Sequence, residues 1–337
     1  MKPSLKMVAE RAEVSPATVS RILNGTAKVS AEKRARIEAA IAELGFRPNM
    51  AARSLAGGRS MSIGVITQFI SSPFYAEALK GLEDELARQN YLPIFMSSHW
   101  DSAQEEHQIT RLIERNVDGI VLLSSQMSGQ KLFEFSNELP IVVTGRHFES
   151  TQASSVNWDN TYSGVLAADH LLELGHREIA VIVGAEGHED SHERMQGIQT
   201  RLKESGVMLN ANCVQMGGYT EQGGYEAAKS LIASGQPFTG LIALNDQMAI
   251  GANMALREAG INVPSQVSLV GCDDIQFAEY VDPPLTTVHQ PIYELGEQAA
   301  KHVLSLVNKV RLPRESIKLP HVVVRGSTAP CQVTVPS

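Results

Sequence analysis

Side chains that can bind a small polar molecule follow several short apolar runs of this sequence. They are Phe74, Tyr75, Arg146, Arg194, Tyr219, Asn245 and Asp273. Aromatic faces can cover the apolar side of a sugar-like ring, and planar polar groups can pair with its hydroxyls. The set therefore predicts a site for a small polyhydroxylated ligand.

Five of these residues also have a plain structural interpretation. Phe74 and Tyr75 could pack at the start of a helix, and Tyr219 could pack in the core. Arg194 could serve as an ion-pair partner, and Asp273 could cap the segment that follows it. Trp100 and Trp158 are assigned to packing and not to the ligand.

The motifs of common enzyme classes are missing from the sequence. No GxGxxG follows an apolar run, and the patterns GxxxxGK[ST], GxSxG and HExxH do not occur. The stretch from His188 to His192 is rich in titratable groups, but its intervals on a loop do not match a usual metal-ligand pattern. We therefore expect no enzyme activity, no cofactor and no metal site.

A second group of candidate residues lies near the N-terminus, where residues 6–23 read KMVAERAEVSPATVSRIL. Two short helical patterns are separated by a break at 13–15. Ser15 can cap the second helix, and Pro16 suits its first position, where no amide hydrogen is needed. The pattern predicts a helix-turn-helix, whose second helix can enter the DNA major groove. An ordinary surface hairpin of two helices would show the same pattern.

Residues 30–59 extend this N-terminal region. Ser30 can cap a third helix, which Gly45 ends. The next stretch, 47–59, carries basic residues around an exposed Leu55. A short basic helix with an apolar wedge suits insertion into the DNA minor groove, whereas a plain linker is the alternative.

From residue 61 onward, apolar runs alternate with helical patterns. We expect strands at 62–67, 92–97, 118–124, 140–145, 178–184, 214–217, 240–245 and 267–274, with helices between them. Regular alternation of this kind is typical of parallel sheets connected by right-handed crossovers. Two such series predict two doubly wound lobes with a crevice between them, at the carboxyl ends of their strands. The candidate ligand residues fall at those strand ends.

Composition and charge fit this division. The chain has 337 residues, enough for two or three domains, and its formal net charge is -8. Residues 1–59 hold eleven Lys and Arg but five Asp and Glu, so a basic head precedes an acidic body. A basic head suits a nucleic acid. The sequence shows no signal peptide and no apolar membrane span, and its three cysteines are far apart, so we expect a cytoplasmic protein without disulfides.

Seven separate motifs, in order, resemble the lactose/galactose-repressor (LacI/GalR) family of bacterial transcription regulators. They are VAERAEVSPATVSRILNG at 8–25, RPNMAARSL at 47–55, RNVDGIVLL at 115–123, LLELGHREIAVIVG at 171–184, ALNDQMAIGA at 243–252, VPSQVSLVGCDD at 263–274 and PPLTTVHQP at 283–291. The resemblance covers nearly the whole chain.

The family pattern implies roles for both groups of residues. The implied DNA-binding residues are Ser15, Pro16, Ala17, Thr18, Ser20, Arg21, Asn24, Asn49, Ala52 and Leu55. Leu55 would be the minor-groove wedge, and Asn24 would hold a phosphate. The ligand residues named above match the family's effector site, with one departure. Many relatives carry Asp or Asn after the strand that ends at Gly145, where this chain has Arg146.

The resemblance implies a helix-turn-helix head at 1–46, a hinge at 47–59 and a periplasmic-binding-protein-like core at 60–330. Lobe one would take about 60–159 and 290–319, and lobe two about 160–289 and 320–330, with crossings near Asn160, His289 and Leu319. Without leucine heptads after Arg325, a homodimer on a palindromic operator is expected. The implied protein is a repressor of a sugar-utilisation operon with a sugar effector. A purine or nucleoside effector, or a two-lobe solute-binding protein, is the alternative.

Overall fold

The computed structural model describes residues 3–23, 30–46, 59–310 and 317–332. The chain divides into two units, Met1–Ser60 and Met61–Ser337, and each is treated by itself below.

The first unit is a small helical head. Its helices are α1 (Leu5–Arg11), α2 (Pro16–Leu23) and α3 (Ala31–Leu44). Val8, Val19 and Ile37, one from each helix, are fully buried and form the centre of its core. Ser30 Oγ accepts a hydrogen bond from the backbone N–H of Lys33 (3.4 Å), and Gly45 ends α3 in the left-handed conformation (φ 59°). Ser30 and Gly45 thus cap the two ends of α3, as predicted.

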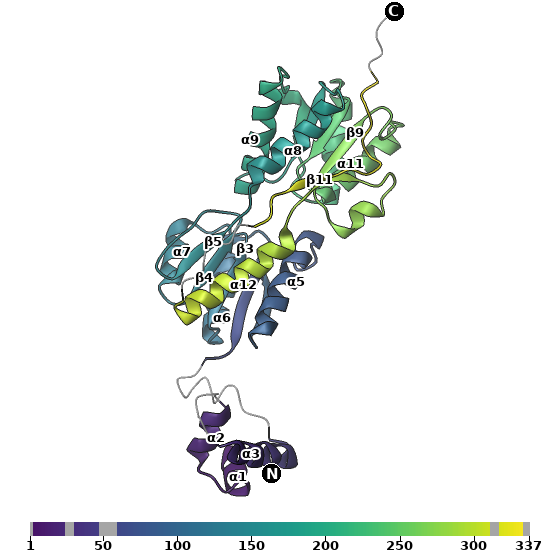
Figure 1. Cartoon of the computed structure of the whole chain (residues 1–337). Coiled ribbons are helices and arrows are strands. Elements are labelled where there is room, and N and C mark those ends of the chain that lie inside the picture. Colours follow the sequence, from purple (N-terminus) through teal and green to yellow (C-terminus); the bar gives the residue numbers. More distant parts are fainter. Residues whose placement is uncertain (1–2, 24–29, 47–58, 311–316, 333–337) are drawn as a thin grey trace, which may run out of the picture. The chain divides into compact units, whose positions relative to one another are not determined.

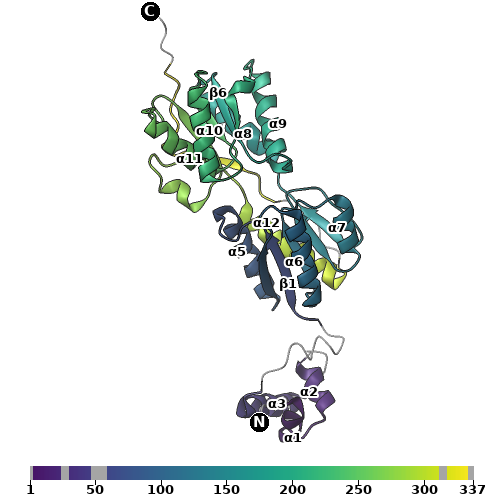
Figure 2. The same cartoon turned by 180° about the vertical axis from the view of Figure 1, so that it is seen from behind.

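The second unit contains two lobes, each built on one sheet with helices on both faces (Figures 1 and 2). The elements of lobe one are β1 (Ser62–Thr67), α5 (Pro73–Arg88), β2 (Leu92–Ser97), α6 (Ser102–Glu114), β3 (Gly119–Leu123), α7 (Gly129–Ser136), β4 (Ile141–Thr144), β5 (Ala153–Val156) and α12 (Ile292–Asn308). Its sheet has the order β2-β1-β3-β4-β5, with all pairs parallel.

Lobe two follows the same plan. Its elements are α8 (Asn160–Glu173), β6 (Ile179–Val183), α9 (Glu189–Glu204), β7 (Val214–Met216), α10 (Glu221–Ala233), β8 (Gly240–Ala243), α11 (Asp246–Glu258), β9 (Ser268–Asp273), β10 (Thr286–His289) and β11 (His321–Val323), with short 3-10 turns at Ala211–Cys213 and Gln276–Glu279. The sheet order is β11-β10-β9-β8-β6-β7, and β11 alone pairs antiparallel.

Alternating strand side chains fill both faces of the lobe-one sheet. Val65 and Val121 pack against α5 and α12, whereas their neighbours Ile66 and Ile120 pack against α6 and α7. Burial on both faces explains why these strands appear in the sequence as unbroken apolar runs. The polar candidate residues therefore lie at the carboxyl ends of the strands of both sheets.

A pair of glycines brings α8 and α9 into direct backbone contact in lobe two. A Cβ added at Gly164 would collide with the carbonyl oxygen of Arg194, and one added at Gly197 would collide with that of Thr161. This close approach fixes the position of α9 along α8, and therefore the position of Arg194 at the cleft.

The structure differs from the sequence predictions at several places. The strands β10 and β11 and the helix α12 all follow the last predicted strand and were not predicted. Ala153–Val156 forms the edge strand β5, although its small and polar residues were not predicted as a strand. Helix α9 begins at Glu189, five residues before the predicted start at Arg194. The predicted loop from His188 to His192 is therefore wrong, because Glu189 and Asp190 form an acidic first helical turn.

Cys213, Cys272 and Cys331 are all unpaired. Among the residues that the structure describes, no helix has the length and apolar character needed to cross a membrane.

Candidate effector cleft and DNA-binding surface

The second helix of the head has an exposed face that the head's own core does not use. Pro16, Ala17 and Arg21 are exposed, and Ser15 at the N-terminus of α2 is exposed as well. Ser15 Oγ accepts a hydrogen bond from the backbone N–H of Thr18 (3.2 Å) and lies 2.8 Å from its Oγ1. This cap fixes the first turn of α2, which carries most of the predicted DNA contacts. Thr18 and Ser20 are half-buried.

The remaining predicted DNA contacts lie outside the described residues. They are Asn24, Asn49, Ala52 and Leu55.

A cavity of about 400 Å³ lies between the two lobes, at the carboxyl ends of their strands. The structure brings most of the predicted effector residues to its wall. They are Phe74 and Tyr75 from lobe one and Arg194, Tyr219, Asn245 and Asp273 from lobe two. The size suits a small-molecule site, since such sites span about 300–1,000 Å³.

An arginine and an aspartate form the buried polar centre of this cavity. Arg194 Nη1 lies 3.2 Å from Asp273 Oδ1, and each side chain is only 4% exposed. The guanidinium also donates to the carbonyl of Leu244 (2.5 Å) and, through Nε, to Asn160 Oδ1 (2.9 Å). Burial raises the pKa of Asp273, and the charge of Arg194 opposes that shift. Arg194 is therefore both the predicted cleft residue and a structural ion-pair partner.

Asp190 is a cleft carboxylate that the sequence predictions did not single out. Its Oδ1 accepts from Asn160 Nδ2 (2.8 Å), so it joins the network of Arg194. Its other oxygen lies 3.2 Å from the place where a Cβ on Gly145 would stand. The carboxylate of Asp190, from lobe two, therefore lies directly beside Gly145 of lobe one. Burial raises the pKa of Asp190 to about 6, against the opposing charge of Arg194.

Aromatic side chains from both lobes meet on one wall of the cavity. Trp100 of lobe one lies edge-on to His188 of lobe two (4.1 Å between centroids) and nearly parallel to Tyr219 (6.4 Å, 18°). The Tyr219 ring fits only because residue 184 is glycine, since an added Cβ would enter the ring. Trp100, which the sequence analysis assigned to packing, lines the cavity, and whether it contacts a ligand stays a prediction. Trp158 is buried beneath Phe74, as expected.

Several cleft residues have a left-handed backbone that non-glycine residues rarely adopt. The φ angles are 60° at Trp100, 69° at Ser124, 64° at Tyr219 and 123° at Asp273. Such conformations each cost about 1–3 kcal/mol and concentrate at ligand sites. Their position at strand ends turns these side chains toward the crevice.

Arg146 lies apart from the other predicted effector residues. It lines a second cavity of about 190 Å³ and donates through Nη1 to the carbonyl of Met127 (2.6 Å). His188 and Asp190 line both cavities, so the two adjoin.

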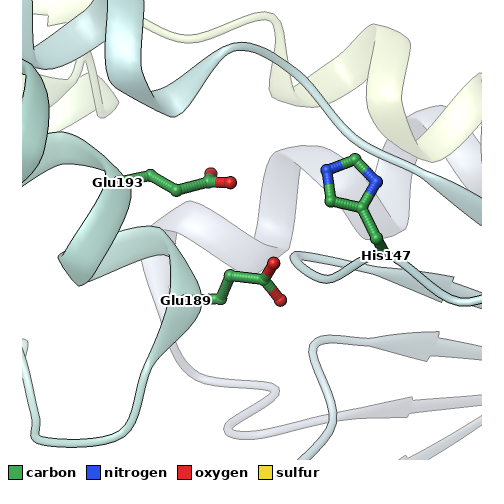
Figure 3. Close-up of side chains that lie close together, drawn as sticks. All are labelled: His147, Glu189 and Glu193. Carbon is green, nitrogen blue, oxygen red and sulfur yellow. The ribbon is translucent and has the colours of Figure 1, made fainter.

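Three ionisable side chains meet across the lobe boundary at the rim of the cleft (Figure 3). Glu189 and Glu193 project from one face of α9 toward His147, and one ligand atom from each of the three lies within 4.8 Å of the others. The helical start at Glu189 creates this spacing, because residues four apart share a helix face. His188 and His192, which made the stretch resemble a metal site in the sequence, are not in the cluster. The expectation of no metal stays a prediction.

A further contact joins the lobes at the mouth of the cleft. Ser72 Oγ, before α5, donates to Gln247 Oε1 on α11 (3.4 Å). Ser72 thus adds to the inter-lobe contacts made by Trp100 and His147. A separation of the two lobes would break these contacts.

Comparisons with known proteins extend the sequence resemblance. Residues 4–49 match the model of "Bacterial regulatory proteins, lacI family", and residues 168–328 match that of a "Periplasmic binding protein-like domain". The chain is 30% identical over 315 residues to the ribose operon repressor of Haemophilus influenzae, covering 94% of this chain and 94% of that protein.

Two solved structures are similar over almost the whole chain. The lac repressor dimer bound to operator and the anti-inducer ONPF has a TM-score of 0.85 at 26% identity, covering 98% of this chain and 100% of that one. The complex of the transcriptional regulator CelR with cellobiose has a TM-score of 0.73 at 30% identity, covering 96% of this chain and 99% of that one.

Proposed function

The chain belongs to the lacI family of bacterial regulatory proteins, and on this premise we propose that it represses a sugar-utilisation operon under the control of a sugar bound between its lobes. As a member of this family it is a DNA-binding transcriptional repressor, and the expectation that it is not an enzyme is confirmed by its relatives. The observation that supports the effector most is the buried Arg194–Asp273 pair at the centre of an aromatic-walled cavity.

For the operator, we propose that α2 enters the major groove. Pro16 and Ala17 are small and apolar, which favours contact with thymine methyl groups over hydrogen bonding. Arg21 is exposed on the same helix and is the best candidate to read a base edge. Asn24, Asn49, Ala52 and Leu55 are proposed to contact the backbone and the minor groove, as the family pattern implies.

For the effector, the cleft chemistry supports a sugar. Asp190 and Asp273 offer carboxylate oxygens to hydroxyl groups, and Phe74 and Trp100 offer ring faces. One similar structure contains cellobiose, and one relative is named for a ribose operon. A purine or nucleoside is the second candidate, because aromatic walls also suit a base. The solute-binding protein loses its support, because the N-terminal residues match the lacI-family head.

We propose that the protein acts in the cytoplasm as a homodimer on a palindromic operator, because two-fold protein symmetry matches two half-sites. The lac repressor structure is described as a dimer on its operator. An effector that changes the contacts between the lobes would shift the hinge of one protomer relative to the hinge of its partner. A short hinge helix is marginal in water, so it is a suitable element for the effector to bias.

Selection of duplex DNA from a genomic library by the full-length chain tests this function. We expect one palindromic sequence to be enriched, with an affinity that falls steeply with salt because phosphates are contacted. A sugar from a panel should then change the affinity for that sequence. Binding that is indifferent to sequence would contradict the proposal.

A further inference from the structure

The effector cleft is divided into two compartments by the first turn of α9. The aromatic compartment is the cavity of about 400 Å³ walled by Phe74, Trp100 and Tyr219. The polar compartment is the cavity of about 190 Å³ lined by Ser124, Gln126 and Arg146. His188 and Asp190 line both, so a ligand that occupies the two compartments must pass these two side chains.

The space exceeds what one sugar ring needs. A water molecule occupies about 30 Å³ in the liquid, so the aromatic compartment alone holds roughly a dozen atoms of that size, about one monosaccharide. The polar compartment adds room for about six more on the same scale. Covalently bonded atoms pack more closely than separate waters, so these figures are lower limits.

The charges of the cleft disfavour an anionic ligand. In the polar compartment, Arg146 lies with two carboxylates, those of Glu189 and Asp190. Asp190, Glu221 and Asp273 line the aromatic compartment, together with the single guanidinium of Arg194. That guanidinium already donates to Asp273, Leu244 and Asn160. Phosphate recognition usually relies on arginines with free paired donors, whereas hydroxyl groups pair well with carboxylates.

The compartments also differ in the surface they offer. Ring faces in the aromatic compartment suit a ring with apolar faces, which is a pyranose or a nucleobase. Serine hydroxyls, an amide and a guanidinium in the polar compartment suit a ring rich in hydroxyl groups.

We propose that the effector is an uncharged glycoside, a sugar ring linked to a second ring, which spans both compartments with the linkage beside Asp190. The inference rests on the proposed effector function of the cleft and specifies its ligand class. The second ring is a sugar in a disaccharide and a base in a nucleoside.

Titration calorimetry of the full-length chain tests the proposal. The probes are disaccharides (cellobiose, maltose, lactose, sucrose), nucleosides (adenosine, cytidine, uridine), monosaccharides (glucose, galactose, fructose, ribose) and glucose 6-phosphate. Trp100→Ala opens the aromatic compartment, and Gln126→Trp fills the polar one. Gln104→Trp places the same ring on an exposed helix of lobe one and serves as the matched control. If Gln126→Trp does not fold by circular dichroism, Gln126→Ala replaces it.

We expect at least one glycoside to bind about tenfold or more tightly than its component monosaccharide, which corresponds to about 1.4 kcal/mol of added contact. Trp100→Ala and the Gln126 variant should each weaken it by a similar factor, while Gln104→Trp should not. Whether disaccharides or nucleosides bind identifies the second ring.

A monosaccharide or glucose 6-phosphate that binds as tightly as any glycoside would overturn the inference. So would a Gln126 variant that binds like the unmodified chain. If such a monosaccharide also changes operator affinity, the proposed function stands without the two-ring ligand. If no probe binds and none changes operator affinity, both fall.

Discussion

Removing the carboxylate of Asp273 tests the buried centre of the cleft. In Asp273→Ala, Arg194 stays buried but keeps only the carbonyl of Leu244 and the side chain of Asn160 as acceptors. Breaking a buried ion pair by removing one partner costs about 3–5 kcal/mol, because a buried charge is left uncompensated. The two remaining acceptors place the expected loss near the lower end, at about 3 kcal/mol.

Urea unfolding of the full-length chain at pH 7, followed by circular dichroism, measures this loss as a lower midpoint of the core transition with an unchanged slope. Glu106→Ala is the matched control, because it breaks an exposed ion pair. The distance from Glu106 to Lys131 is 2.9 Å, and their side chains are 42% and 46% exposed, respectively. Exposed pairs contribute about 0–1 kcal/mol, so this variant should unfold almost like the parent.

The double variant Arg194→Met with Asp273→Ala, compared with Asp273→Ala alone, isolates the effect of the buried charge. Because both charges are removed together, most of the lost stability should return, while effector binding should not. A loss below about 1 kcal/mol in Asp273→Ala, indistinguishable from the exposed control, would refute the argument that this pair is a buried and coupled centre.

Four further predictions concern both units. Gly164→Ala should lower the free energy of unfolding by about 1–3 kcal/mol, because the added Cβ collides with the carbonyl oxygen of Arg194, whereas Gly129→Ala, whose Cβ meets no neighbour, should stay within about 0.5 kcal/mol in the same urea assay. If hydroxyl groups bind the ionised Asp190, effector affinity should be nearly full at pH 7 and about tenfold lower at pH 5, because the pKa of this carboxyl is about 6, and calorimetry of Asp190→Asn should show no such pH dependence. Leu55→Ala should weaken operator binding and leave effector binding intact; equal loss of both would contradict its role as a wedge. Arg21→Ala should relax base preference at one operator position by about 1–3 kcal/mol, measured by competition with substituted operators.

Much of the fold is encoded locally and was predictable. Ser15, Ser30 and Gly45 are capping residues whose effect needs only their neighbours. Ser15 and Ser30 begin helices and Gly45 ends one, as expected. The apolar runs at β1 and β3 are buried on both faces, so their pattern is strong. The prediction of a helical head followed by two α/β lobes is confirmed by these elements and by the similar structures.

The errors arise where the structure depends on distant neighbours. The strand β5 has little apolar character of its own, and it forms because β4 offers an open edge for pairing. Trp100 lines the cleft and contacts His188 of lobe two. That contact depends on how the lobes meet, and no local pattern specifies it.

The start of α9 had a signal that was available in the sequence. Glu189 and Asp190 are acidic residues typical of a first helical turn. A helix from this point puts Asp190 and Arg194, four residues apart, on one face. With that start, Asp190 would have joined the predicted cleft residues.

Operator affinity in the presence of the effector tests the central claim most directly. The measurement is fluorescence anisotropy of the selected palindromic DNA with the full-length chain, with and without the compound that binds the cleft, and again with Asp273→Asn. The account predicts that the compound changes operator affinity for the parent chain and that Asp273→Asn loses this response while it still binds the DNA. A compound that occupies the cleft and leaves operator affinity unchanged would contradict it.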